Sequence, residues 1–85
     1  MAKILRYHVI FRPEPEGGFT VLVPSLSGCI TWGKDIEEAK KMAQEAVELY
    51  IESLRDDGEE IPVDSGILTG SLDIPFESRR KPVHA

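Results

Sequence analysis

Few side chains in this sequence could carry out catalysis, and their spacing matches no catalytic motif. His8 lies within an apolar run, His84 is next to the last residue, and Cys29 has no histidine beside it. Ser25 and Ser27 flank a turn, but neither lies in a G-x-S-x-G pattern. An active site needs a reactive group beside a group that activates or orients it. We therefore expect His8 to be a surface or half-buried residue and Cys29 to be a small buried apolar side chain.

The carboxylates and glycines also lack the spacing of a metal or cofactor site. Neither of the glycine-rich patterns that cradle phosphates, G-x-x-x-x-G-K-[ST] and G-x-G-x-x-G, occurs. Glu37-Glu38 and Glu59-Glu60 are adjacent pairs, and adjacent residues on a helix do not face each other. The expected strands hold almost no acidic residues, which would leave a two-metal nuclease without its first-strand carboxylate. The sequence therefore predicts no enzyme, no metal site and no cofactor.

Composition narrows the class of protein further. The 85 residues make one small domain with a net charge of −5, which argues against a generally basic nucleic-acid-binding surface. Residues 35–60 alone hold ten acidic and three basic side chains. No apolar run approaches the roughly 18 residues of a membrane span, and Arg6 and His8 interrupt the first apolar stretch, unlike a signal peptide. With a single cysteine, which excludes an intrachain disulfide, these features predict a cytoplasmic protein.

The elements that must position any functional residue begin with three predicted strands. Residues 4–11 are predicted to form the first strand, in which successive side chains point to opposite faces. Leu5, Tyr7, Val9 and Phe11 lie on one of these faces. Residues 13–18, which include two prolines and two glycines, predict a hairpin loop. Residues 19–23 and 29–32 are the second and third strands. Connections this short favour antiparallel neighbours.

A long amphipathic helix follows the third strand. Asp35 is a good N-cap, and Glu38 three residues later resembles a capping box. Apolar residues then recur with the spacing of one buried helical face, at positions 36, 39, 43, 46, 47, 50, 51 and 54. Gly58 fits the C′ position. The helix of about 22 residues is long enough to cross a small sheet.

Residues 67–76 are predicted to supply a fourth strand, because Leu72, Ile74 and Phe76 alternate there. The predicted fold is α+β, with an antiparallel sheet and one long helix on one face. Residues 1–76 form the single domain, and residues 77–85 are a mobile basic tail. The uncovered face would carry Ile4, Ile10 and Leu22, which indicates a subunit or partner interface. We expect a homodimer or tetramer that uses this face or a sheet edge.

Trp32 has two interpretations. The favoured one places it in the core or at an edge, beside Ile30 on the helix, because it precedes the helix start. The other makes it the anchor of a partner interface, where tryptophan is enriched.

A set of motifs spread over most of the chain resembles the HicB-like antitoxin family. The family pattern V-P-[DS]-L-x-G-C-x-T-x-G is similar to residues 23–33, VPSLSGCITWG, at every defined position. An acidic-apolar-x-E-A helix start matches residues 35–39, A-x-E-A-[IV] matches residues 43–47, and G-x-x-I-P matches residues 58–62. The resemblance covers residues 5 to about 64.

The resemblance implies a partial RNase-H-like β-β-β-α-β fold without the nuclease carboxylates. It implies an antitoxin that binds HicA, a small RNA-cleaving toxin, and blocks the toxin's active site. Many relatives add a DNA-binding segment. Only about 20 residues follow Pro62 here, too few for a helix-turn-helix, so we do not expect direct DNA binding. The alternative is a small homo-oligomeric binding or scaffold domain with no toxin partner.

The charge pattern indicates which residues would meet a basic toxin. We expect carboxylates to take the place of RNA phosphates there, because complementary charge gives such inhibitors association rate and specificity. The candidate partner-binding residues are Glu14 and Glu16 on the hairpin, Glu37 and Glu45 on the helix, and Trp32. The candidate nucleic-acid contacts are Arg79, Arg80 and Lys81 in the tail.

Overall fold

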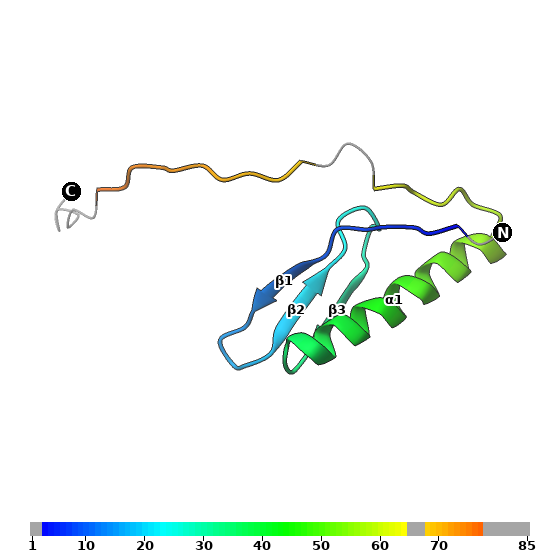
Figure 1. Ribbon diagram of the computed structural model, residues 1–85, viewed down its shortest axis with the longest axis horizontal. Helices are drawn as coiled ribbons and strands as arrows, with labels where there is room; N and C mark the ends of the chain where they lie inside the picture. The colour runs from blue at the N-terminus through cyan, green and yellow to red at the C-terminus, as the bar shows by residue number, and fades with distance from the viewer. Residues whose placement is uncertain (1–2, 65–67, 78–85) are drawn as a thin grey trace, which may run out of the picture.

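The computed structural model describes residues 3–64 and 68–77, and it confirms the predicted α+β class with three strands followed by one helix. The strands β1 (Ile10–Pro13), β2 (Phe19–Leu22) and β3 (Ile30–Gly33) form an antiparallel sheet in the order β1-β2-β3. Helix α1 (Ile36–Asp56) packs along one face of this sheet (Figure 1). No helix in the described part of the chain is both long and apolar enough to cross a bilayer.

The strand register decides which side chains face the helix. Val21 lies between Phe11 on β1 and Thr31 on β3, and this row faces α1. The next row, Ile10, Leu22 and Ile30, therefore points away from the helix. We call this helix-free side the outer face.

The core lies between the sheet and the helix in two clusters. One contains Val21, Ala39 and Ala43, with Val9, Phe11 and Phe19 packed against it. The other contains Val23, Leu26 and Cys29, and it is covered by Tyr7 and by side chains of α1. The predicted inward face of the first strand is therefore confirmed for Tyr7, Val9 and Phe11.

Both predicted ends of α1 are confirmed. The Glu38 amide donates to Asp35 Oδ1 at 2.8 Å, and the Glu38 carboxylate accepts from the Lys34 amide at 2.8 Å. At the other end, Gly58 has a φ of 68°, which favours glycine. The amide of Gly58 donates to Arg55 and that of Glu59 to Leu54, the two bonds of a Schellman motif.

Replacing Asp35 with alanine should lower the free energy of unfolding by about 1 kcal/mol, because the Glu38 amide loses its acceptor. Urea denaturation followed by circular dichroism measures this change. Asp73→Ala, at an exposed position outside any strand or helix, is the matched control and should change nothing measurable. An equal loss in both variants would contradict the capping role.

The first strand is shorter than predicted, because its partner turns away. Pairing begins at Ile10, whereas residues 3–9 are extended without belonging to the sheet. Continuing the register would bring His8 opposite Pro24, which has no amide hydrogen to donate. One residue beyond Leu22, the Val23 amide donates to the Cys29 carbonyl, next to the β2–β3 turn.

The predicted fourth strand is not formed within residues 68–77. This segment has no strand assignment, and Leu72, Ile74 and Phe76 are 87%, 74% and 85% exposed. Alternation alone does not make a strand, because a strand also needs a neighbour to pair with, and the segment runs away from the sheet and helix (Figure 1). Residue 67 and the tail residues Arg79, Arg80 and Lys81 lie outside the described residues.

Candidate partner-binding surface

Four of the five candidate partner-binding residues lie at one end of the sheet. Pro13, Phe19 and Gly33 are neighbours in register, so the β1–β2 turn and the start of α1 are at the same end (Figure 1). This hairpin end carries Glu14, Glu16, Trp32 and Glu37. Glu45 is eight residues farther along α1, about 12 Å along the helix axis.

The two hairpin carboxylates have different surroundings. Glu14 Oε2 accepts from Thr20 Oγ1 at 2.6 Å and from Arg12 Nε at 3.2 Å. These hydrogen bonds, from Thr20 first and then Arg12, hold the pKa of Glu14 below its usual value. Glu16 is exposed at the tip of the turn, which is closed by a 2.9 Å bond from the Gly17 amide to the Glu14 carbonyl. Glu14 therefore shapes the hairpin, whereas Glu16 is free to meet a partner.

Trp32 lies on the outer face, so the favoured prediction that it packs on the helix is wrong. Thr31 faces inward beside Val21, and strand alternation therefore turns Trp32 and Ile30 outward. The indole lies over Gly18, where a Cβ would overlap the ring, and Trp32 remains 48% exposed. With Ile10 and Ile30, both at least half exposed, it gives the outer face an apolar patch, next to Arg12 and Thr20 on the same face. Ile4 is exposed too, but in the extended residues before β1.

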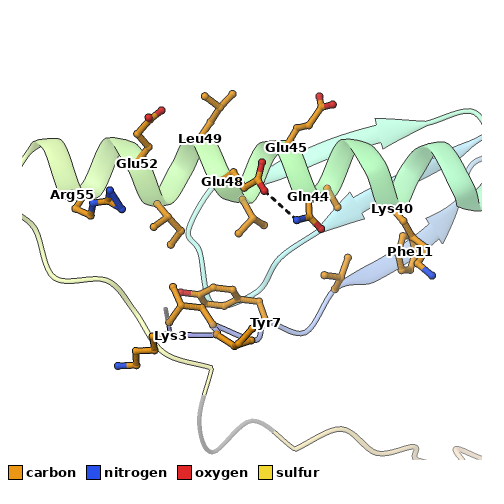
Figure 2. A pocket seen from close by; sticks show the side chains of 16 residues that line it. Lys3, Tyr7, Phe11, Lys40, Gln44, Glu45, Glu48, Leu49, Glu52 and Arg55 are labelled. Atoms are coloured by element: carbon orange, nitrogen blue, oxygen red, sulfur yellow. Dashed lines mark hydrogen bonds between the residues drawn. The ribbon is translucent and has the colours of Figure 1, made fainter. Parts of the chain in front are cut away.

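The two helix candidates are exposed carboxylates on different parts of α1. Glu37 is in the first turn, where negative charge is favourable. Glu45 points away from the segment that precedes β1, as do Leu49 and Glu52 (Figure 2). Glu37 and Glu45 could contact one large partner together, but the helix does not cluster them.

A polar cluster that the sequence analysis missed joins three distant parts of the chain. The Asp64 carboxylate accepts from Ser25 Oγ at 2.5 Å and from the His8 amide at 2.5 Å. His8 Nδ1 lies 2.6 Å from the same Asp64 oxygen that the amide contacts. The Tyr7 hydroxyl donates to the Pro62 carbonyl at 2.6 Å. These contacts span 39 to 56 residues, so no local pattern predicts them.

The cluster has the residue types of a hydrolase triad but not its arrangement. In a triad the histidine stands between the serine and the aspartate and takes the serine proton. Here Asp64 stands in the middle, and the Ser25 hydroxyl donates to it. We call residues His8, Ser25 and Asp64 the Asp64 clamp, because they fasten the chain after α1 to the residues before β1 and to the β2–β3 turn.

The Asp64 carboxyl should make the fold sensitive to acid. Hydrogen bonds from Ser25 and His8 hold its pKa below the usual value, and its side chain is only 3% exposed. A lowered folded-state pKa means that the stabilisation is present above the unfolded pKa and is lost as pH falls through the folded value. We expect Asp64→Asn to be less stable than the parent at pH 7 and to lose less stability between pH 5 and pH 2. Urea titrations across that range measure both differences, and Asp73→Asn is the control.

The other side chains considered for chemistry, the Cys29 thiol and possible metal ligands, do not form a reactive site among the residues that the structure describes. Cys29 is buried as predicted, and burial raises the pKa of its thiol, which disfavours the reactive thiolate. Among residues 3–64 and 68–77 there is no group of three histidine, cysteine or acidic side chains placed to hold a metal ion.

Comparison with known proteins identifies the family. Residues 7–77 match the family described as HicB-like antitoxin of bacterial toxin–antitoxin systems. A UPF0150 protein of Thermoplasma acidophilum is 43% identical over 61 residues, which are 72% of this chain and 88% of that protein. A UPF0150 protein of Synechocystis is 40% identical over 71% of this chain and 76% of its own length.

A named antitoxin is also similar. Antitoxin HicB 1 of Photorhabdus laumondii is 33% identical over 79 residues, which are 93% of this chain but only 51% of that longer protein. The match over residues 7–77 spans all three strands, α1 and the Asp64 clamp. This chain therefore belongs to the HicB-like antitoxin family.

Proposed function

We propose that the protein is a non-catalytic antitoxin that binds a HicA-type mRNA-cleaving toxin and blocks its active site. Family membership supports this function. The observation that carries it is the hairpin end, where exposed Glu16 and Glu37 lie at the same end as the half-exposed Trp32. An aromatic anchor beside acidic side chains is a suitable surface for a basic, RNA-binding protein.

The inhibition is electrostatic and steric. A toxin that cleaves RNA needs cationic side chains for the phosphates, and the carboxylates of the hairpin end would occupy them. Residues 35–60 carry a net charge of −7 and lie mostly on α1. That field would accelerate the encounter at low ionic strength.

Blocking requires no chemistry from this chain. The Ser25 hydroxyl is bound to a carboxylate rather than to a base, and the Cys29 thiol is buried. The antitoxin therefore acts by occupancy, with one toxin neutralised by each hairpin end.

The first experiment is affinity purification of the tagged chain from its native host, with mass spectrometry of what stays bound. We expect a small basic protein in near-equal amount. Its ribonuclease activity should be suppressed when the chain is added back at a one-to-one ratio. A co-purified protein without ribonuclease activity would contradict the proposal, and so would activity that the chain leaves unchanged.

The apolar outer face favours the second candidate, a homo-oligomeric binding domain without a toxin. Ile10, Ile30 and Trp32 form an exposed apolar surface of the kind that monomeric proteins usually cover. Recovery of the chain alone, under conditions that preserve complexes, would support this candidate instead.

A further inference from the structure

An open groove runs between α1 and the chain that leads into β1. One wall is made of residues 3–11, which contribute Leu5, Tyr7, Val9 and Phe11, and the other wall is α1 (Figure 2). The helix contributes apolar Ala43, Val47 and Ile51, with Gln44 at the rim. β1 is an outer strand of the sheet. The groove is therefore the place where one more strand would extend the core.

The same chain carries a segment whose large apolar side chains are exposed and do not pack in the core. Residues 68–77, which we call the C-terminal segment, expose Leu72, Ile74 and Phe76 at alternate positions. Asp73 and Pro75 lie between them, so an extended segment gathers the three large apolar side chains on one side. This side of the C-terminal segment has the apolar pattern expected of a strand that would fill the groove.

The Asp64 clamp limits where the C-terminal segment can go. It holds Asp64 beside His8, and β1 ends five residues later, at Pro13. From Asp64, Leu72 to Phe76 are 8 to 12 residues away, about 26–40 Å of extended chain. The distance from His8 to the end of β1 is only about 17 Å at the same rise. An extended segment therefore passes the end of its own sheet, and it must fold back to enter its own groove.

We propose that the C-terminal segment enters the groove of a second copy and forms the fourth strand there, in a reciprocal homodimer. Each copy offers one segment and one groove, which is the self-complementary arrangement of a two-fold dimer. Leu72, Ile74 and Phe76 would contact the apolar walls, and the segment backbone would pair with β1 or the residues before it. A standard interface buries roughly 1,200–2,000 Å², and the two-fold arrangement would divide that area between two seated segments.

The oligomeric state of the full chain, without any toxin, tests the proposal. We expect sedimentation equilibrium to detect a dimer at chain concentrations between about 1 and 100 µM. A complex with a micromolar dissociation constant changes from mostly monomer to mostly dimer across this range. Ile74→Asp should raise the dimer dissociation constant about 100-fold or more, because it places an unpaired carboxylate in an apolar groove. Since Ile74 is exposed in the single chain, the helical signal in the circular dichroism spectrum of the Ile74→Asp variant should be unchanged.

Ile36→Asp is the matched control. Ile36 is an exposed apolar residue in the first turn of α1 and is not one of the residues that line the groove, so this variant should dimerise like the parent. A parent chain that is monomeric at 100 µM would overturn the proposal. A dimer that tolerates Ile74→Asp but is disrupted by Ile30→Asp would overturn it too, because the outer face would then be the interface.

Disulfide trapping distinguishes a second copy from the same copy. Chains with Gln44→Cys alone are mixed with chains that carry Ile74→Cys alone, and the mixture is oxidised gently. We expect a disulfide-linked pair that contains one chain of each kind, whereas neither variant alone should cross-link efficiently. Chains carrying both substitutions that form only an intrachain disulfide would show the segment folded into its own groove, and the proposal would be wrong.

Discussion

Replacing Gly33 with alanine should lower the free energy of unfolding by about 3 kcal/mol, the upper range for overpacking a tight site. Gly33 is buried at the end of β3, where a Cβ would overlap the backbone nitrogen and Cα of Ala39. A helix backbone cannot yield as the end of a flexible side chain can. The first turn of α1 would have to separate from the sheet and expose Val21 and Ala39.

Urea denaturation of Gly33→Ala, compared with the parent, measures the effect. The total free energy of unfolding of a domain of this size is about 4–13 kcal/mol. The expected loss is therefore a large part of it. Gly70→Ala is the matched control, because a Cβ there meets nothing within 4 Å. A Gly33→Ala variant as stable as Gly70→Ala would contradict the close contact between β3 and α1.

The contact at Gly33 also explains why the recognisable motifs are structural rather than functional. Leu26 and Cys29 fill the second core cluster, and Ala39 is fully buried in the first. Gly28, with a φ of 78°, permits the turn that brings β3 back along β2. These residues identify the family because they build the sheet–helix junction. They give no information about which surface a partner contacts.

Local signals predicted the helix and the hairpin well. The Asp35 cap and the Gly58 terminus depend on atoms within five residues of each other, so the sequence contains the whole interaction. The first strand was extended too far because its length depends on β2, which turns at Pro24. A strand forms only where two segments pair by hydrogen bonds, whereas the alternation of apolar and polar side chains is a feature of one segment alone.

The face of Trp32 could have been predicted, whereas the Asp64 clamp could not. Cys29, Thr31 and Gly33 are small and alternate, which is typical of the side of a strand that a helix approaches closely, and Trp32 falls between them. The prediction followed the position of Trp32 just before the helix instead of this alternation. Asp64, in contrast, meets Ser25 and His8 only because the chain after α1 returns to the sheet.

Reversing two charges at the hairpin end, with Glu16→Lys and Glu37→Lys together, should weaken toxin binding about 100-fold, because two repulsive contacts replace attractive ones. Both side chains are exposed, so the fold should be retained. Glu14→Lys is a poorer test, because it also removes the acceptor of Thr20 and Arg12 and disturbs the hairpin itself. Isothermal titration calorimetry with the purified toxin measures the affinity.

The control must change the net charge equally without touching the hairpin end. Glu59→Lys with Glu60→Lys does so, because both residues are exposed and follow α1 at the opposite end of the helix. If binding depends on local carboxylates, the control pair should weaken it less than about tenfold, mainly through association rate, and added salt should reduce the difference. Equal losses in both pairs would mean that the toxin responds to total charge. Undiminished affinity in the hairpin-end pair would place the toxin on another surface, and Glu45→Lys and Trp32→Ala would then separate the helix from the outer face.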